Sequence, residues 1–208
     1  MKKYFSGNSL LISNIESLNR INKYLKNLLI IIFGSILLAI SARIKIDIPP
    51  VPVTMQTLVL LVFAMSVGWK LSVTTFIVYL AEGSFGLPVF ANPPFGGAGY
   101  LMGPSGGYLL GMLFASFLVG YLAENNYDKN YIKSFIAILL GTIVIFIPGL
   151  IWLAYWFNFI SSNALEINTA QSISLELEFG LLKFIYTEPI KVALTAAITP
   201  LIWQYIKK

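Results

Sequence analysis

The chain of 208 residues contains no cysteine and no histidine. Without cysteine it forms no disulfide, holds no soft metal through thiolates and uses no thiolate nucleophile. Without histidine it lacks the imidazole that most often serves as a general base and as a metal ligand. A phosphate-binding loop of the form G-x-x-x-x-G-K-[ST] is also missing. The sequence therefore predicts no metal centre, no cofactor and no ATP hydrolysis by the chain itself.

Charged residues are scarce as well. They make up 11% of the chain, against about 25% in soluble domains. Hydrophobic residues make up 57%, and the mean hydropathy is +0.79. This composition predicts an integral protein of the cell membrane that crosses the lipid bilayer several times. The formal net charge of +5 is interpreted as a sign of membrane topology, so no nucleic-acid partner is implied.

Long apolar segments recur along the chain. A membrane-spanning helix needs about 20 mostly apolar residues. Six segments approach this length, at residues 25–44, 55–68, 71–88, 105–123, 132–157 and 185–206. The second and third are short and are separated only by Gly68, Trp69 and Lys70. We predict an all-α integral membrane fold with six transmembrane helices over residues 25–208, preceded by a cytoplasmic lead-in over residues 1–24.

Basic residues are distributed unevenly between the two sides of such a bundle. With the N-terminus inside, the inner segments hold Lys2, Lys3, Arg20, Lys23, Lys26, Lys70, Lys129, Lys133, Lys207 and Lys208. The outer segments hold only Arg43, Lys45 and Lys183. Because cytoplasmic loops carry the excess of lysine and arginine, this asymmetry predicts that both termini lie inside the cell.

The last apolar segment contains two ionisable residues, Glu188 and Lys191. Residues three positions apart share one face of a helix. Ionisable groups are costly inside a bilayer, so they indicate a buried functional site by default. Two interpretations stay open: the pair binds a ligand that carries amide-like and acidic groups, or the two charges only neutralise each other.

A proline-rich segment, IDIPPVPVTMQT, follows the first apolar segment. Pro49, Pro50 and Pro52 fix φ and remove hydrogen-bond donors, which predicts a stiff, extended strap on the outer side. Thr54 and Gln56 follow at once and favour a polar contact there. An ordinary proline-rich connector is the alternative.

A glycine-rich segment, GSFGLPVFANPPFGGAGYLMGPSGGYLLG, follows the third apolar segment. Irregular backbone at membrane depth survives only where it is buried in protein or lines a cavity. Phe90 and Tyr108 supply flat apolar walls, and Asn92 supplies donors and an acceptor for an amide-like partner. The segment therefore predicts a pocket-lining loop, with an outer cap that holds no ligand as the alternative.

Within this segment, residues 103–107 formally match the G-x-S-x-G nucleophile motif around Ser105. That motif needs a histidine base, and the chain has none. The glycines more plausibly permit a tight entry into the next helix. An intramembrane hydrolase that uses Ser105 is kept as an alternative of a different class, and we predict that the chain is not an enzyme.

The order of IPPVPVTMQT, YLAEGSFGLPVFANPPFGG, GPSGGYLLG and a late acidic-x-x-Lys helix resembles the BioY family, the biotin-binding S components of energy-coupling factor (ECF) transporters. The resemblance runs from about Ile36 to Pro200. It implies an S-component-like bundle with an outer-facing pocket that docks onto a transmembrane coupling protein and two ATPases. Family members typically carry Gly-Asp-x-x-Lys at the last helix, where this chain has Thr187, Glu188 and Lys191.

The chemistry of biotin fits the residues singled out above. Its ureido group needs donors and acceptors, which Glu188, Asn92 and Gln56 supply. Its sulfur-containing ring needs apolar walls such as Phe90 and Tyr108, and its carboxylate needs a cation such as Lys191. The predicted partners are biotin, the bilayer and either an ECF module or further copies of the chain. An S component for another small vitamin is the alternative within transport.

Overall fold

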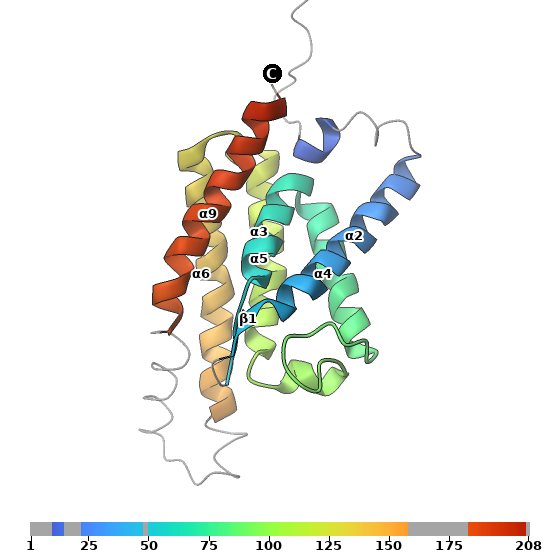
Figure 1. The fold of residues 1–208 in the computed structure, drawn as a ribbon, viewed down its shortest axis with the longest axis vertical. Helices are drawn as coiled ribbons and strands as arrows, with labels where there is room; N and C mark the ends of the chain where they lie inside the picture. The colour runs from blue at the N-terminus through green and yellow to red at the C-terminus, as the bar shows by residue number, and fades with distance from the viewer. Residues whose placement is uncertain (1–9, 15–21, 48–49, 158–182, 207–208) are drawn as a thin grey trace, which may run out of the picture.

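The computed structural model describes residues 10–14, 22–47, 50–157 and 183–206. In these ranges the chain forms six α-helices, one two-stranded hairpin and three short 3-10 helices (Figure 1). The α-helices are α2 (Lys23–Arg43), α3 (Gln56–Val67), α4 (Trp69–Ser84), α5 (Gly106–Glu124), α6 (Tyr131–Tyr155) and α9 (Lys183–Ile206). The short elements are β1 (Lys45–Ile46), β2 (Val53–Thr54), η1 (Leu11–Asn14), η2 (Ala98–Met102) and η3 (Tyr127–Lys129).

Each predicted apolar segment overlaps one of these helices, with ends that differ by up to four residues. Gly68, with a φ of 83°, ends α3 and separates it from α4, as the sequence suggested. The helix α4 ends at Ser84, short of the predicted residue 88, because Gly86 has a positive φ and Pro88 follows. The helices α2, α5 and α6 are long and apolar enough to cross a membrane, and α3 is a shorter apolar helix.

The helix α5 occupies the middle of the bundle and packs against α3, α4 and α6, while α9 packs against α6 and α3. Glycines allow these close approaches. A Cβ added at Gly111 would lie 2.5 Å from the carbonyl oxygen of Ile145 on α6. A Cβ added at Gly120 would lie 2.5 Å from the backbone of Trp69 on α4. The small residues of α5 therefore set the spacing of its neighbours.

Large apolar side chains lie on the outside of the bundle as well as inside it. Phe33 and Ile36 of α2 and Ile147 and Ile151 of α6 are exposed, whereas the side chains between the helices are buried. An apolar exterior is stable in contact with lipid, not with water. The chain is a membrane protein.

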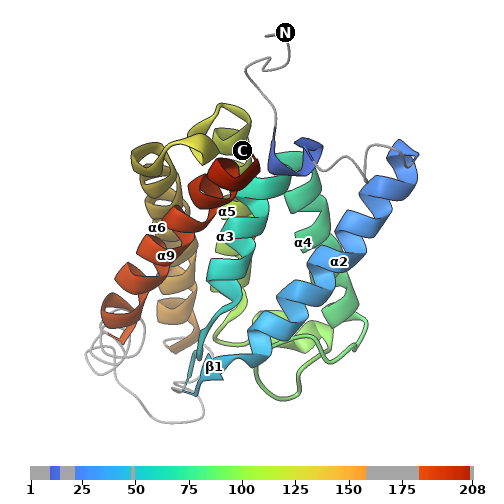
Figure 2. The same cartoon turned by 45° about the horizontal axis from the view of Figure 1, so that its top comes forward.

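The proline-rich segment and the glycine-rich segment lie together at one end of the bundle (Figure 1). The end of the segment predicted as an extended strap is extended, because Val53–Thr54 form β2, which pairs antiparallel with β1, Lys45 with Thr54 and Ile46 with Val53. The C-terminal end of α9 and η1 lie at the opposite end (Figure 2). Ile48, Pro49, most of the lead-in and the loop before α9 lie outside the described residues.

Candidate ligand-binding site

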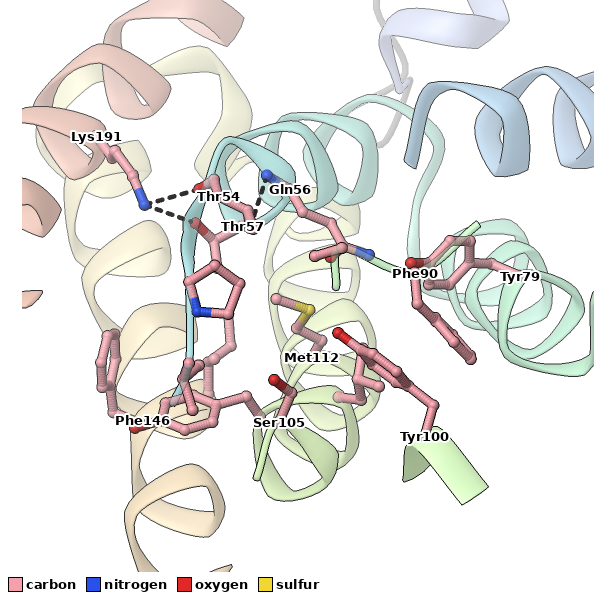
Figure 3. A pocket seen from close by; sticks show the side chains of 16 residues that line it. Thr54, Gln56, Thr57, Tyr79, Phe90, Tyr100, Ser105, Met112, Phe146 and Lys191 are labelled. Carbon is pink, nitrogen blue, oxygen red and sulfur yellow. Dashed lines mark hydrogen bonds between the residues drawn. The ribbon is translucent and has the colours of Figure 1, made fainter. Parts of the chain in front are cut away.

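A cavity lies at the hairpin end, between β2, the first turn of α3, the glycine-rich segment, α5, α6 and α9 (Figure 3). Its free volume is about 40 Å³, so the lining side chains are closely packed around it. Besides the tyrosines, five polar side chains line the cavity. They belong to Thr54, Gln56, Thr57, Ser105 and Lys191. Its aromatic lining side chains belong to Tyr79, Phe90, Tyr100, Tyr108 and Phe146.

Lys191 is the charged residue among those that line this cavity. Figure 3 shows its side chain extending from α9 toward the hairpin. Its Nζ lies 2.7 Å from Oε1 of Glu188 and donates to the carbonyl oxygen of Thr54 at 2.9 Å. It also reaches Oγ1 of Thr57 at 3.5 Å. The ammonium therefore connects α9 to β2 and to the start of α3.

Glu188 is buried, with 8% of its surface exposed, and is held by Lys191. It does not line the cavity. It lines an apolar groove between α6 and α9 together with Phe135 and Leu139. The i, i+3 spacing brings the two charges together as predicted, but only Lys191 is directed to the cavity. Pro189 lies within α9, because the helix begins at Lys183 and not at the proline.

Gln56 is the first residue of α3, and its side chain lines the cavity (Figure 3). Only 4% of its surface is exposed. Its backbone N–H donates to Oγ1 of Thr54 at 3.3 Å, which fixes the start of the helix. Its Nε2 makes no hydrogen bond of good geometry to the residues that the structure describes, and the Tyr79 hydroxyl is a polar neighbour of this amide. A buried donor without a partner is costly, so this amide is suited to a ligand acceptor.

Phe90 and Tyr108 both line the cavity, as predicted for its walls. Phe90 is fully buried and stacks on Tyr100 with ring centroids 4.4 Å apart, while Tyr79 meets it edge-on at 5.7 Å. Tyr108 meets Phe146 edge-on at 5.8 Å. Three further aromatic rings thus hold Phe90 and Tyr108 in fixed orientations.

Asn92 does not line this cavity. It lines an adjacent space, here called the outer chamber, which is formed by Pro50, residues 92–94, Gly99, Tyr100 and residues 103–105. The Oδ1 of Asn92 accepts a hydrogen bond of 2.6 Å from Nζ of Lys45 on β1. Of the six predicted site residues, the cavity therefore gathers Gln56, Phe90, Tyr108 and Lys191, while Glu188 and Asn92 border it.

The sequence pattern that defines the BioY family matches residues 12–208 of this chain. The chain belongs to the BioY family. The resemblance drawn from its proline-rich and glycine-rich motifs is thereby confirmed.

Known relatives of this BioY chain are described as biotin transporters. A probable biotin transporter BioY from Rickettsia prowazekii is 35% identical over 137 residues, covering 64% of this chain and 68% of the relative. The biotin transporter BioY from Thermotoga maritima is 32% identical over 163 residues, covering 78% and 86% of the two chains. The crystal structure of an S-component for biotin from an ECF-type ABC transporter aligns with a TM-score of 0.67 at 28% identity, covering 88% of this chain and 93% of the other. The expectation of a transport protein, not an enzyme, agrees with these relatives.

Sequence reasoning missed several residues that line the cavity of this BioY chain. Tyr79 and Met112 lie inside apolar helices, where their types carry no signal of a site. Nearby glycines mark only the packing of Phe90 and Tyr108, which were predicted. A Cβ at Gly83 would overlap the ring of Phe90, and one at Gly149 would lie 2.5 Å from the ring of Tyr108. Glycine at such positions indicates that a ring is packed against the helix.

Ser105 lines both the cavity and the outer chamber. It precedes α5, yet its hydroxyl makes no capping hydrogen bond to that helix. The lining residues of the two spaces offer no carboxylate that would act as a base beside it. Sequence analysis set the residue aside as a false match to a nucleophile motif, and its position in the structure suits a contact with a ligand.

Proposed function

We propose that this BioY-family chain is the membrane-embedded subunit that captures biotin for uptake, in the cavity beside Lys191. The observation that carries the proposal is an aromatic cavity whose charged lining residue is Lys191, next to the unpartnered Nε2 of buried Gln56. Biotin combines an apolar ring with a carbonyl oxygen that accepts such donors. Phe90 and Tyr108 contact the ring, and Glu188 acts by orienting Lys191.

The hairpin end of the bundle faces the outside of the cell in this proposal. All six helices cross the plasma membrane, both termini lie inside, and residues 1–24 form a cytoplasmic lead-in to the substrate-binding domain over residues 25–208. The distribution of lysine and arginine supports this orientation. The cavity then opens toward the outer surface, where a scarce vitamin is captured.

Transport against a gradient requires an energy source that the chain does not contain, since it has no nucleotide-binding loop. Membership of the BioY family supports delivery of biotin with a transmembrane coupling protein and two ATPase subunits of an ECF module. A homo-oligomer is the alternative assembly. Co-purification of a tagged chain with its cellular partners separates the two.

The function is tested by calorimetric titration of the purified chain in detergent with biotin, thiamin and riboflavin. Binding of biotin alone is expected. If the chain binds thiamin or riboflavin but not biotin, the same fold serves another vitamin. Retention of binding and uptake in Ser105→Ala, at whatever affinity, would exclude the alternative of a hydrolase that uses this serine.

A further inference from the structure

An apolar groove lies on the outside of the bundle between α6 and α9, which run side by side in both views (Figures 1 and 2). It follows one face of α6 from Phe135 to Leu150, and Glu188, Pro189 and Val192 line it from α9. Its free volume is about 420 Å³. Because α6 is long and apolar enough to cross a membrane, lipid reaches this groove from the side.

The groove offers little to a polar occupant, since Thr142 and Glu188 are the polar residues of its lining. Oγ1 of Thr142 donates to the carbonyl oxygen of Ile138 at 2.9 Å. Glu188 is paired with Lys191 at 2.7 Å. An ordered water needs several polar partners, and apolar spaces inside proteins stay dry. The groove is therefore suited to a hydrocarbon occupant.

The dimensions of the groove fit one acyl chain of a lipid. From Phe135 to Leu150 the groove extends about 22 Å along α6, more than the depth of about 15 Å of one leaflet of the hydrocarbon core. The two helices lie close together, because the hydroxyls of Ser134 and Thr199 are 3.3 Å apart. A further helix of about 10 Å diameter would occupy roughly 1,700 Å³ over the same length. That is several times the free volume of the groove, whereas a single hydrocarbon chain is far thinner.

The groove shares a wall with the cavity. Phe146 lines both spaces, and its ring meets that of Tyr108 edge-on at 5.8 Å. Glu188 lines the groove, while Lys191, which it holds, lines the cavity. The attraction between two charges is stronger in an apolar surrounding than in water. An occupant of the groove therefore backs the ring of Phe146 and keeps Lys191 in place.

We propose that this groove binds one acyl chain of a membrane phospholipid, and that the bound acyl chain completes the wall between the cavity and the bilayer. The lipid site is independent of the transported ligand, whereas its effect on biotin rests on the proposed function. Membrane lipid raises the affinity of the protein for biotin, because it supports Phe146 and the ion pair from behind. Leu139 lines the groove and not the cavity, so a larger side chain there would fill the lipid site alone.

Photolabelling tests the lipid site. The purified protein is placed in phosphatidylcholine nanodiscs that contain a phosphatidylcholine with a diazirine in its acyl chain. Leu139 lines the groove and Leu140 does not, although their exposed fractions of 40% and 42% are nearly equal and the two are neighbours along α6. Mass spectrometry should find Leu139 labelled several-fold more often than Leu140. Equal labelling would mean that lipid only surrounds the bundle and would overturn the inference.

Leu139→Trp fills the groove with an indole, and Leu140→Trp is the matched control. The first variant should lose most of the label at Ile143, another residue of the groove lining, and the second should keep it. Undiminished label at Ile143 in Leu139→Trp would contradict the site. If the melting temperature shows that Leu139→Trp is unfolded, the smaller change Leu139→Phe replaces it in the same comparison.

The effect on biotin is measured in a fluorinated surfactant, whose thick tails do not replace a hydrocarbon chain. Addition of phosphatidylcholine should lower the dissociation constant of biotin for the unmodified protein and for Leu140→Trp by about fourfold, the factor that burial of one methylene group provides. Leu139→Trp should show no such change, because the indole already supports the wall. An equal gain in Leu139→Trp, or no gain in any of the three proteins, would overturn the link to the cavity. If none of them binds biotin, the proposed function fails, and photolabelling still decides the lipid site.

Discussion

At the scale of single residues, the contacts of Lys191 decide how the cavity works. Its ammonium is bonded to Glu188 on its own helix and to Thr54 on the hairpin. A buried ion pair of this kind is weak evidence for stability, because desolvation offsets most of the attraction. The pair is better explained as a way of holding one cation at a defined place against a ligand.

Replacement of Lys191 by alanine should weaken biotin binding by about 2 kcal/mol or more, or roughly 30-fold. The reason is the loss of a donor to the ligand together with the unpaired charge that remains on Glu188. Calorimetric titration measures the change, and Lys70→Ala at an exposed position serves as the control. If a folded Lys191→Ala variant binds biotin with unchanged affinity, Lys191 does not contact the ligand.

Glu188→Gln keeps the shape of the side chain and removes its charge. We expect biotin binding to weaken by about 1 kcal/mol, because a neutral amide oxygen holds the ammonium less firmly than a carboxylate does. The direction of the change is informative. Tighter binding would mean that Glu188 opposes the ligand instead of orienting Lys191 for it.

At the scale of elements, close packing of α4 against the glycine-rich segment positions the aromatic wall. A Cβ at Gly83 would overlap the ring of Phe90, which is fully buried and stacked on Tyr100. Gly83→Ala should therefore destabilise the chain by about 1–3 kcal/mol, the usual cost of overpacking, and weaken biotin binding. Thermal unfolding and titration measure the two effects. Gly99→Ala is the control for stability, since a Cβ there meets nothing within 4 Å.

At the end of the bundle opposite the hairpin, Asp128 links η3 to α9. Its carboxyl is buried and accepts a hydrogen bond of 2.6 Å from Nε1 of Trp203, and Lys129 lies over the indole ring. Burial raises the pKa of Asp128 above its usual value. The folded chain then binds a proton more tightly than the unfolded chain, so stability falls as the pH rises from the unfolded pKa through the folded one.

Asp128→Asn removes this titration and keeps an acceptor for Trp203. The variant should melt at a higher temperature than the parent at pH 8, with a difference that shrinks toward pH 4.5. Each 1 kcal/mol corresponds to about 2–4 °C in a chain of this size. Melting curves at the two pH values test the sign, and a gain that is independent of pH would contradict the role of the charge.

Much of the element pattern was predictable, because hydropathy and glycine act locally. The apolar segments became helices, and Gly68 separated α3 from α4. The hairpin was not predictable, since pairing of Ile46 with Val53 depends on where two helices end. The i, i+3 rule brought Glu188 to Lys191, but only tertiary packing decides that Lys191 and not Glu188 faces the cavity. The separation of Asn92 from the cavity depends on the fold of the glycine-rich segment in the same way.

At the scale of the whole molecule, the two ends of the bundle differ in chemistry. The hairpin end holds the cavity and the outer chamber, with Arg43 and Lys45 at its rim. The opposite end holds η3 and the last turn of α9, with Lys129 and Lys133 nearby. Since cations accumulate on the cytoplasmic side, this distribution supports the proposed entry of the ligand at the hairpin end from outside.

The native chain has no cysteine, so each engineered cysteine is a unique label for this topology. Asp47 lies at the hairpin end, and Lys70 and Gln204, both exposed, lie at the other end. In intact cells, a membrane-impermeant maleimide should label Asp47→Cys and leave Lys70→Cys and Gln204→Cys unlabelled until the membrane is opened. Biotin uptake in each variant shows that the labelled chain is functional. The reverse pattern would place the cavity on the cytoplasmic side, where it could not capture a vitamin from outside.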